Sequence, residues 1–278
     1  MINFNWASYD SNTNNPIISN ADIANYAERL LAKHMPRLLK EAGPINFMRF
    51  LELALGANVE IQDIYYGIDE PAIMGMTVFD NSKVKLFDKE NMSVREIICG
   101  SGTIILDKSM IEDNDESFAR FTGLHEGGHF CLHPETFRRI RIKSRIDGGQ
   151  AQLGDKVACS KKSIDNSSEE GLTLHGIRWD AEACREHQAN VFSAHLAMPA
   201  KTFIPEAKAM IRSLGFEDYL ICEEVIKTEY YHEYCQHIKR LARLYGMSFT
   251  ATKNHLKNHG LLITRLQHEL MHRGVFYF

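Results

Sequence analysis

The chain has 278 residues, of which 44% are hydrophobic and 24% are charged. This apolar share excludes an intrinsically disordered chain, and the length suits one large domain or two modest ones. The formal net charge is only −4, so the protein has no overall positive field for nucleic acid or a membrane surface.

The cysteines and the N-terminal residues indicate the cellular compartment of the protein. The six cysteines are scattered and no two form a C-x-x-C pair, which argues against a cysteine-rich structural zinc site. Residues 1–15 are rich in Asn and Ser without an apolar stretch, unlike a signal peptide. No segment approaches the roughly 20 apolar residues of a membrane span. These features predict a cytoplasmic protein with reduced thiols and no membrane association.

Helices are expected to open the chain, and short strands to follow them. Residues 1–18 are expected to be a flexible tail. The sequence predicts helices over Asn20–His34, with Asn20 as the cap, and Pro44–Leu55, with Gly56 just past the end. Asp80–Ser82 predicts a hairpin connection between two strands. Short segments rich in β-branched and aromatic residues predict these strands: Val59–Tyr66, Ile73–Phe79, Val84–Asp88 and Gly102–Asp107.

The centre of the sequence predicts a long helix followed by an irregular insertion. The helix runs from about Asp113 to His133, and the spacing of Asp113 and Glu116 suits a capping box. Pro134 is expected to stop it. Residues 135–178 read as an irregular insertion, in which the basic run 138–145 alternates like an exposed strand.

The remaining sequence predicts further helices. One runs from about Asp180 to Ala197, and the chain is mostly helical from Pro205 onward. A small sheet before a set of helices indicates an α+β fold. We expect a catalytic domain over residues 19–205 and a helical extension over residues 206–278. Three glycines are expected to break the extension: Gly215, Gly246 and Gly260.

The most informative motif is His125-Glu126-Gly127-Gly128-His129, which has the form H-E-x-x-H. On a helix, two histidines four residues apart lie on one face, one turn above the other. Two neutral imidazoles so placed can bind one Zn²⁺ at about 2.0–2.1 Å. The carboxylate of Glu126 lies beside them and can accept a proton from a metal-bound water. The motif predicts zinc-dependent hydrolysis with Glu126 as general base.

The same helix carries three glycines, Gly123, Gly127 and Gly128. Each costs roughly 0.8–1 kcal/mol relative to alanine in a helix interior. We therefore expect them to make room for a neighbouring strand or helix close to the metal.

A catalytic zinc site needs a third protein ligand. His133 lies too far along the helix axis to join His125 and His129, and Glu135 stands where a third histidine would extend the motif. Glu182 and Glu186 lie one turn apart on the helix after Asp180. We favour Glu186 and keep Glu182 as an alternative, because the Asn190 amide, four residues after Glu186, can orient a ligand. His133 is expected to pack behind the ligands.

Several segments resemble the ImmA/IrrE family of metallopeptidases. Thr122–His129, followed by Leu132-His133, is similar to the motif helix of that family. Glu186–Pro199 is similar to the family block E-x-x-A-N-x-F-A-A-x-L-L-M-P, and Gly102–Asp107 to the strand before the motif helix. The similar segments cover the middle of the chain in the same order as in the family.

The resemblance implies a zincin-like, gluzincin-like fold and Glu186 as the third zinc ligand. It also implies action on a partner transcriptional repressor, because family members typically cleave or inactivate such repressors. The departures leave the ligands in place and affect these positions: Gly127, Ser193, His195 and Ala197. The insertion at 135–178 leaves substrate selectivity open.

The C-terminal sequence has two interpretations. Leu241–Ser248 followed by Ala251–Leu262 has the rhythm of a helix-turn-helix. Residues 236–268 contain six Lys or Arg and no acidic residue, which suits contact with DNA. A helical pair packed on the catalytic domain is the favoured interpretation. The run 138–145 suits an acidic partner or a solvated face.

Taken together, these features predict a zinc metalloendopeptidase acting on a helix-turn-helix repressor, with Glu126 as base. His125, His129 and Glu186 are the predicted metal ligands. Gly102–Asp107 is expected to be an edge strand to which an extended substrate could add. The alternatives are a non-catalytic zinc-containing regulator that binds a repressor or DNA, and the toxin of a toxin–antitoxin pair. Three residues are candidates for stabilising the oxyanion: His175, Arg178 and His195.

Overall fold

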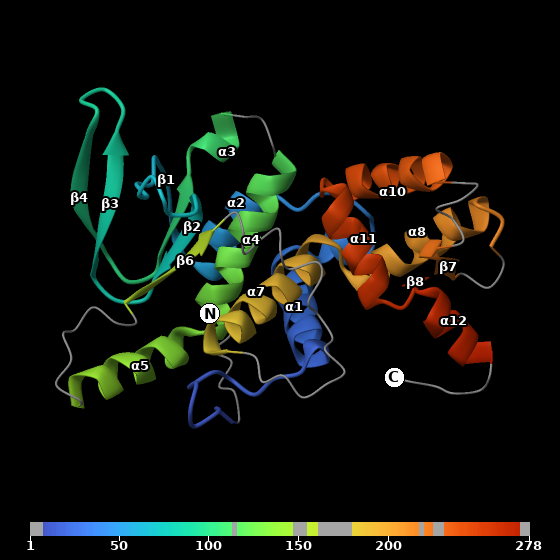
Figure 1. The fold of residues 1–278 in the computed structure, drawn as a ribbon, viewed down its shortest axis with the longest axis horizontal. Helices are drawn as coiled ribbons and strands as arrows, with labels where there is room; N and C mark the ends of the chain where they lie inside the picture. Colours follow the sequence, from blue (N-terminus) through green and yellow to red (C-terminus); the bar gives the residue numbers. More distant parts are fainter. Residues whose placement is uncertain are drawn as a thin grey trace.

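A small mixed sheet with helices packed beside it forms the centre of this computed structural model (Figure 1). The structure describes residues 8–112, 116–146, 155–160, 180–216, 220–224 and 231–272. Figure 1 shows a hairpin of two strands at one end of the molecule and the C-terminal helices at the other. The predicted α+β class is confirmed, because a mixed sheet and a set of helices make up the described chain.

The N-terminal helices form close to their predicted positions. Helix α1 (Asn20–His34) begins after Ser19, whose hydroxyl accepts from the backbone N–H of Asp22 while the Asp22 carboxylate accepts from Ser19. The cap is therefore Ser19 and not Asn20. A short 3₁₀ turn, η1 (Pro36–Leu39), follows. The second predicted helix comprises α2 (Phe47–Arg49) and the π-helical turn η2 (Phe50–Leu55), which ends at the left-handed Gly56 (φ 74°). It begins three residues later than predicted, after the Asn46 cap.

Residues 8–18 lie against helix α7 (Ala181–Ala197), although we expected them to belong to a flexible tail. The Asn15 side chain is buried and donates to the Ala181 carbonyl over 2.7 Å. Pro16 accepts from the Gln188 amide over 3.0 Å. The Asn15 side chain and the Pro16 carbonyl thus hold this segment on α7. Residues 1–7 lie outside the described chain.

The four-stranded sheet has the order β1-β5-β2-β6. Its strands are β1 (Asn58–Gln62), β2 (Ile73–Val78), β5 (Thr103–Asp107) and β6 (Lys156–Ser160). β5 pairs in parallel with β1 and antiparallel with β2, and β2 pairs antiparallel with β6. The prediction that the strand at 102–107 is an edge is therefore wrong. All five residues of β5 are buried, as suits a strand with neighbours on both sides.

A second correction concerns the hairpin. β3 (Ser82–Asp88) pairs antiparallel with β4 (Ser93–Cys99), a strand that was not predicted. The expected pairing of 73–79 with 84–88 is wrong, because β2 is already paired on both sides within the main sheet. A small apolar cluster, which includes Val78, Leu86 and Ile105, joins this hairpin to one face of the sheet.

The motif helix α4 (Glu116–Leu132) follows the short α3 (Ser109–Glu112) and packs on the other face of the sheet. The expected cap at Asp113 lies outside the described residues. Helix α5 (Pro134–Ile146) follows, so the prediction of an irregular segment and a basic strand is wrong there. Pro134 opens α5, where its missing N–H costs nothing. Glu135 then pairs with Arg138 at 2.6 Å and with Arg139 at 2.9 Å, a spacing that suits a helix.

The C-terminal part is mostly helical, as predicted. After α7, which follows the Asp180 cap, come the following elements: α8 (Ala200–Ser213), β7 (Ile221–Cys222), α10 (Tyr231–Tyr245), α11 (Phe249–Asn258), β8 (Leu262–Ile263) and α12 (Arg265–His272). The predicted breaks at Gly215, Gly246 and Gly260 are confirmed, and each glycine has a positive φ. The expected boundary at residue 205 falls inside α8, because α8 begins at Ala200.

One hydrophobic core joins the two halves of the molecule. Phe50 and Phe192 belong to the same buried cluster as Tyr245 and Leu256 of the C-terminal helices. The helical pair α10–α11 is therefore packed against the rest of the fold. Across the residues that the structure describes, no helix is both long and apolar enough to cross a membrane.

Candidate metal centre

Close contact between α4 and α7 brings the predicted metal ligands together. A Cβ at Gly128 would lie 2.9 Å from the Ala189 Cα, so only glycine allows this backbone approach. A Cβ at Gly127 would meet Leu51, and one at Gly123 would meet Phe47. The expectation that these glycines make room for neighbouring elements is confirmed, and α7 and α2–η2 are the neighbours.

The predicted ligands converge on one point. The Nε2 atoms of His125 and His129 lie 3.0 Å apart. Glu186 Oε2 lies 3.2 Å from His125 Nε2, and Glu186 Oε1 lies 3.1 Å from His129 Nε2. Ligands of a tetrahedral zinc ion at about 2.0–2.1 Å lie about 3.3 Å from one another. The three side chains therefore have the spacing of a zinc coordination shell and could hold such an ion.

Glu186, rather than Glu182, supplies the third group. Glu182 is exposed on the first turn of α7, whereas the Glu186 side chain is only 13% exposed. Glu186 Oε2 accepts no hydrogen bond from the described residues, although it lies 3.2 Å from His125 Nε2. The two atoms point towards a common centre and not towards each other, as ligands of one ion do.

A chain of hydrogen bonds fixes the tautomer of His129. The Pro16 carbonyl can only accept, so the NH₂ group of the Gln188 amide faces this carbonyl. The amide oxygen of Gln188 therefore faces His133. His133 Nε2 therefore donates to Gln188 over 2.9 Å, and its Nδ1 accepts from His129 Nδ1 over 3.0 Å. His129 Nε2 is left with a lone pair directed at the metal position. His133 thus packs behind the ligands, as predicted.

Asn190 has the corresponding role for His125. Its Oδ1 accepts from His125 Nδ1 over 2.7 Å, which directs the Nε2 lone pair at the same centre. Such outer contacts orient metal ligands and raise their basicity. Asn190 was expected to orient a ligand, and the structure shows that this ligand is His125.

The general-base candidate Glu126 lies beneath strand β2. Its Oε2 accepts from the Thr77 hydroxyl over 2.6 Å, while Oε1 is buried without a hydrogen-bond partner in the described chain. A Cβ on Gly75 would lie 2.7 Å from Oε1, so the glycine makes space for the carboxylate. Burial raises the pKa of Glu126 to about 8. Thr77 therefore holds one oxygen and leaves the other available for a proton.

Cys159 lies beside the centre, on the edge strand β6. A bulge between Ile73 and Gly75 places Cys159 opposite Gly75, on the face towards α4. Its sulfur lies within 4.8 Å of ligand atoms of His125 and Glu126, and these three residues form a second possible metal-binding group. All six cysteines lie in the described chain, and none forms a disulfide.

The charges of the centre favour a cation. Burial alone would lower the pKa of His125, but Cys159 and Glu186 beside it raise this pKa well above its usual value. Burial opposes the ionisation of Glu186, yet His129 and His125 hold its pKa well below the usual range. Burial lowers the pKa of His129, which keeps this ligand neutral. The pocket thus stabilises positive charge between the two helices.

The structure separates the three oxyanion candidates. His175 and Arg178 lie outside the described residues. His195 lies nine residues after Glu186 on α7, about 13 Å along the helix axis, and is grouped with His255 and His259. The prediction that His195 serves this centre is therefore wrong.

Thr77, Cys159 and Gln188 were not predicted to belong to the centre. Gln188 carries the strongest available signal, because it lies between Glu186 and Asn190 in the block singled out from the sequence. Thr77 and Cys159 reach the centre only through strand pairing, which the sequence did not reveal.

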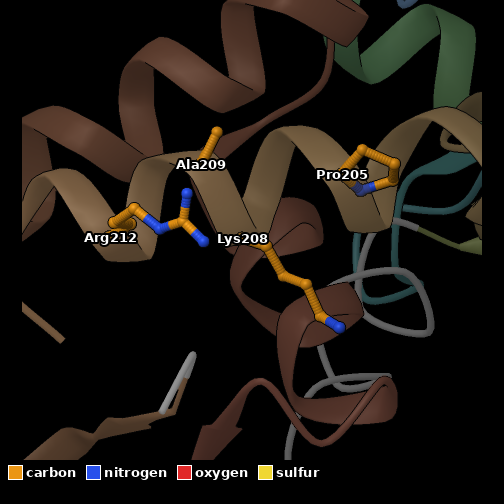
Figure 2. A pocket seen from close by; sticks show the side chains of 4 residues that line it. All are labelled: Pro205, Lys208, Ala209 and Arg212. Carbon is orange, nitrogen blue, oxygen red and sulfur yellow. The ribbon is translucent and has the colours of Figure 1, made fainter. Parts of the chain in front are cut away.

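A shallow depression lies elsewhere, on α8. Figure 2 shows that one helix supplies its whole lining, which consists of Pro205, Lys208, Ala209 and Arg212. None of the candidate ligands lines it, so the depression has no part in the metal centre.

Comparison with known proteins does not identify the chain. A scan against models of known protein families gives no match, and no curated protein has significant similarity to the sequence. The candidate function rests on the residues themselves.

Proposed function

We propose that this chain is a zinc-dependent endopeptidase of the ImmA/IrrE type, with a zincin-like catalytic region. His125, His129 and Glu186 bind the metal, and Glu126 is the general base. The observation that carries this proposal is the convergence of two imidazole Nε2 atoms and a carboxylate, all within 3.2 Å of one another, beside a buried glutamate.

The donor set suits zinc. Two imidazoles and one carboxylate are a common protein contribution to catalytic zinc, which keeps a fourth position for water or substrate. When bound, zinc would lower the pKa of a water and polarise the substrate carbonyl. Glu126 Oε1 would take the proton from this water and deliver it to the leaving amine, while Thr77 holds Oε2 in place.

The proposed substrate is a protein, and a partner helix-turn-helix repressor is the class that the resemblance favours. The C-terminal helices do not need to contact DNA for this function. Two of their lysines, Lys253 and Lys257, pair with Glu223, and one face of α11 is buried at Thr252, His255 and Leu256. These contacts support a packed helical pair.

Cleavage of a purified helix-turn-helix repressor tests the proposal, and a repressor gene adjacent to this one would nominate the protein to use. Zinc-loaded protein is incubated with the purified repressor, and fragments are identified by intact-mass spectrometry. Glu126→Gln should lower the cleavage rate by about 10²–10⁴-fold while zinc remains bound. Glu182→Gln, an exposed carboxylate on α7, serves as the matched control and should cleave at the wild-type rate. Cleavage by Glu126→Gln at the wild-type rate would refute the catalytic role.

Cys159 favours one second candidate function. Cys159 forms a second possible metal-binding group with His125 and Glu126, and a cysteine ligand is typical of structural zinc. The protein would then be a non-catalytic regulator that binds a repressor.

Cys159→Ser distinguishes the two functions. In a protease the variant keeps its zinc, because three ligands remain, and it cleaves at least as fast as the wild type. In a structural site, loss of the thiolate weakens zinc binding, and no cleavage is seen with either protein.

A further inference from the structure

A second histidine cluster lies where α7 meets α11, outside the proposed catalytic centre. His195 stands near the end of α7, and His255 and His259 lie one turn apart on α11. One ring nitrogen from each residue lies within 4.8 Å of the other two. His195 lies 60 positions before His255 in the sequence, so only the packing of the C-terminal helices brings it to the other two.

The spacing of the His255–His259 pair is close to that of His125 and His129, although His255 Nε2 here faces the Met198 carbonyl. The Nε2 atoms of His255 and His259 are 3.1 Å apart, compared with 3.0 Å for His125 and His129. The ring centroids are separated by 4.5 Å at 88° in the second pair and by 4.8 Å at 75° in the first. His195 meets both rings edge-on, at 5.1 and 5.6 Å.

Hydrogen bonds within the protein leave this cluster incompletely satisfied. His255 is 1% exposed, and its Nε2 lies 2.9 Å from the Met198 carbonyl. Its Nδ1 is buried with no hydrogen-bond partner in the chain that the structure describes. A buried polar atom without a partner costs about 1–3 kcal/mol. Because the Met198 carbonyl can only accept, the proton of His255 stays on Nε2, and Nδ1 carries the lone pair that a cation would bind.

The three imidazoles are also in the form that binds metals. Burial lowers the pKa of His195 to about 4 and lowers the pKa of His255 and His259 as well. Neutral imidazole is the ligand species, so no proton has to leave at neutral pH.

We propose that His195, His255 and His259 bind a second divalent transition-metal ion of the zinc class. Three imidazoles suit Zn²⁺, Co²⁺ or Ni²⁺ rather than Ca²⁺ or Mg²⁺, which prefer oxygen ligands. The ion ties α11 to the helix that carries Glu186 and so links the C-terminal region to the catalytic centre (Figure 1).

Metal content per chain tests this site without any activity measurement. Protein refolded or dialysed with excess Zn²⁺ and then gel-filtered should contain two zinc ions per chain. His259→Ala and His195→Gln should each contain one. His129→Ala should also contain one, and His129→Ala combined with His259→Ala should contain none. His232→Ala, an exposed histidine on α10, is the control and should keep two.

The outcomes separate this proposal from the proposed function. One zinc ion in the wild type, lost in His129→Ala and kept in His259→Ala, overturns the second site and leaves the protease proposal intact. Two ions with one lost in His259→Ala support the second site, even if no cleavage is found. Titration with Co²⁺ gives a second readout. The wild type should show two visible-absorption transitions and folded His259→Ala only one, with folding checked by circular dichroism.

Discussion

The two histidine clusters of this protein share a plan and differ in their neighbours. Each has a pair of histidines at i and i+4 on one helix and a third group from α7, either Glu186 or His195. The first cluster lies beneath the sheet, beside Glu126, Thr77 and Cys159. The second consists of imidazoles packed against Phe203. Each cluster could therefore hold a metal ion, and only the first has beside it a buried carboxylate that suits the proposed hydrolysis.

The two clusters also differ in the direction in which their surroundings shift the pKa values of their histidines. In the first cluster, Glu186 and Cys159 raise the pKa of His125 well above its usual value. In the second, burial dominates and lowers the pKa of each of His195, His255 and His259. The first cluster therefore has a carboxylate beside its imidazoles, whereas burial favours the neutral form of all three imidazoles in the second.

The largest expected effect follows from removal of Glu186, the carboxylate that distinguishes the first cluster. Glu186→Gln should weaken zinc binding at this cluster by at least about 100-fold, because a ligand contributes more than the 10–100-fold typical of its outer contacts. Competition with a chromophoric chelator measures the affinity. Glu182→Gln, one turn earlier on α7, should bind zinc as the wild type does. Equal weakening by both substitutions would contradict the assignment of Glu186.

The outer contacts of the first cluster should have the next largest effect. Asn190→Ala removes the acceptor that fixes His125 Nδ1, so zinc binding should weaken about 10–100-fold. The same chelator competition measures the change, and the loss should be confined to one of the two ions. Unchanged affinity would mean that Asn190 only packs between the helices.

Close packing of α4 on α7 holds the first cluster together, and two glycines allow it to be tested. Gly128→Ala places a methyl group against the Ala189 backbone and should cost about 1–3 kcal/mol of unfolding free energy. Gly127→Ala meets only the end of the Leu51 side chain, so a helix-propensity gain of about 1 kcal/mol offsets most of its cost. Urea unfolding compares the two variants. A Gly128→Ala variant as stable as Gly127→Ala would contradict the close approach.

The smallest expected effect concerns pH and the second cluster. His195 has a pKa of about 4 in the folded chain and near 6.5 when unfolded, so the unfolded state binds more protons between these values. The unfolding free energy of chelator-treated protein should therefore fall as pH drops from about 7 towards 4. His195→Gln should reduce this fall by roughly 1–2 kcal/mol between about pH 7 and 5. Urea titrations at both pH values measure it, and an unchanged slope would contradict burial of His195.

Local sequence determined much of the helical framework and the heart of the candidate site. The i, i+4 spacing of His125 and His129 and the glycine breaks both depend on residues within one or two turns. Helix geometry places such neighbours without reference to the rest of the chain. The choice of Glu186 over Glu182 also followed from a local relation to Asn190.

Only the tertiary structure decided how the strands pair and what surrounds the metal ligands. A strand's partners lie far along the chain, so local pattern gave neither the central position of β5 nor the pairing of β3 with β4. The same reason explains why Thr77 and Cys159 were missed at the first cluster. The sequence left His195 as one of three candidates for stabilising the oxyanion, whereas the tertiary structure placed it beside His255 and His259.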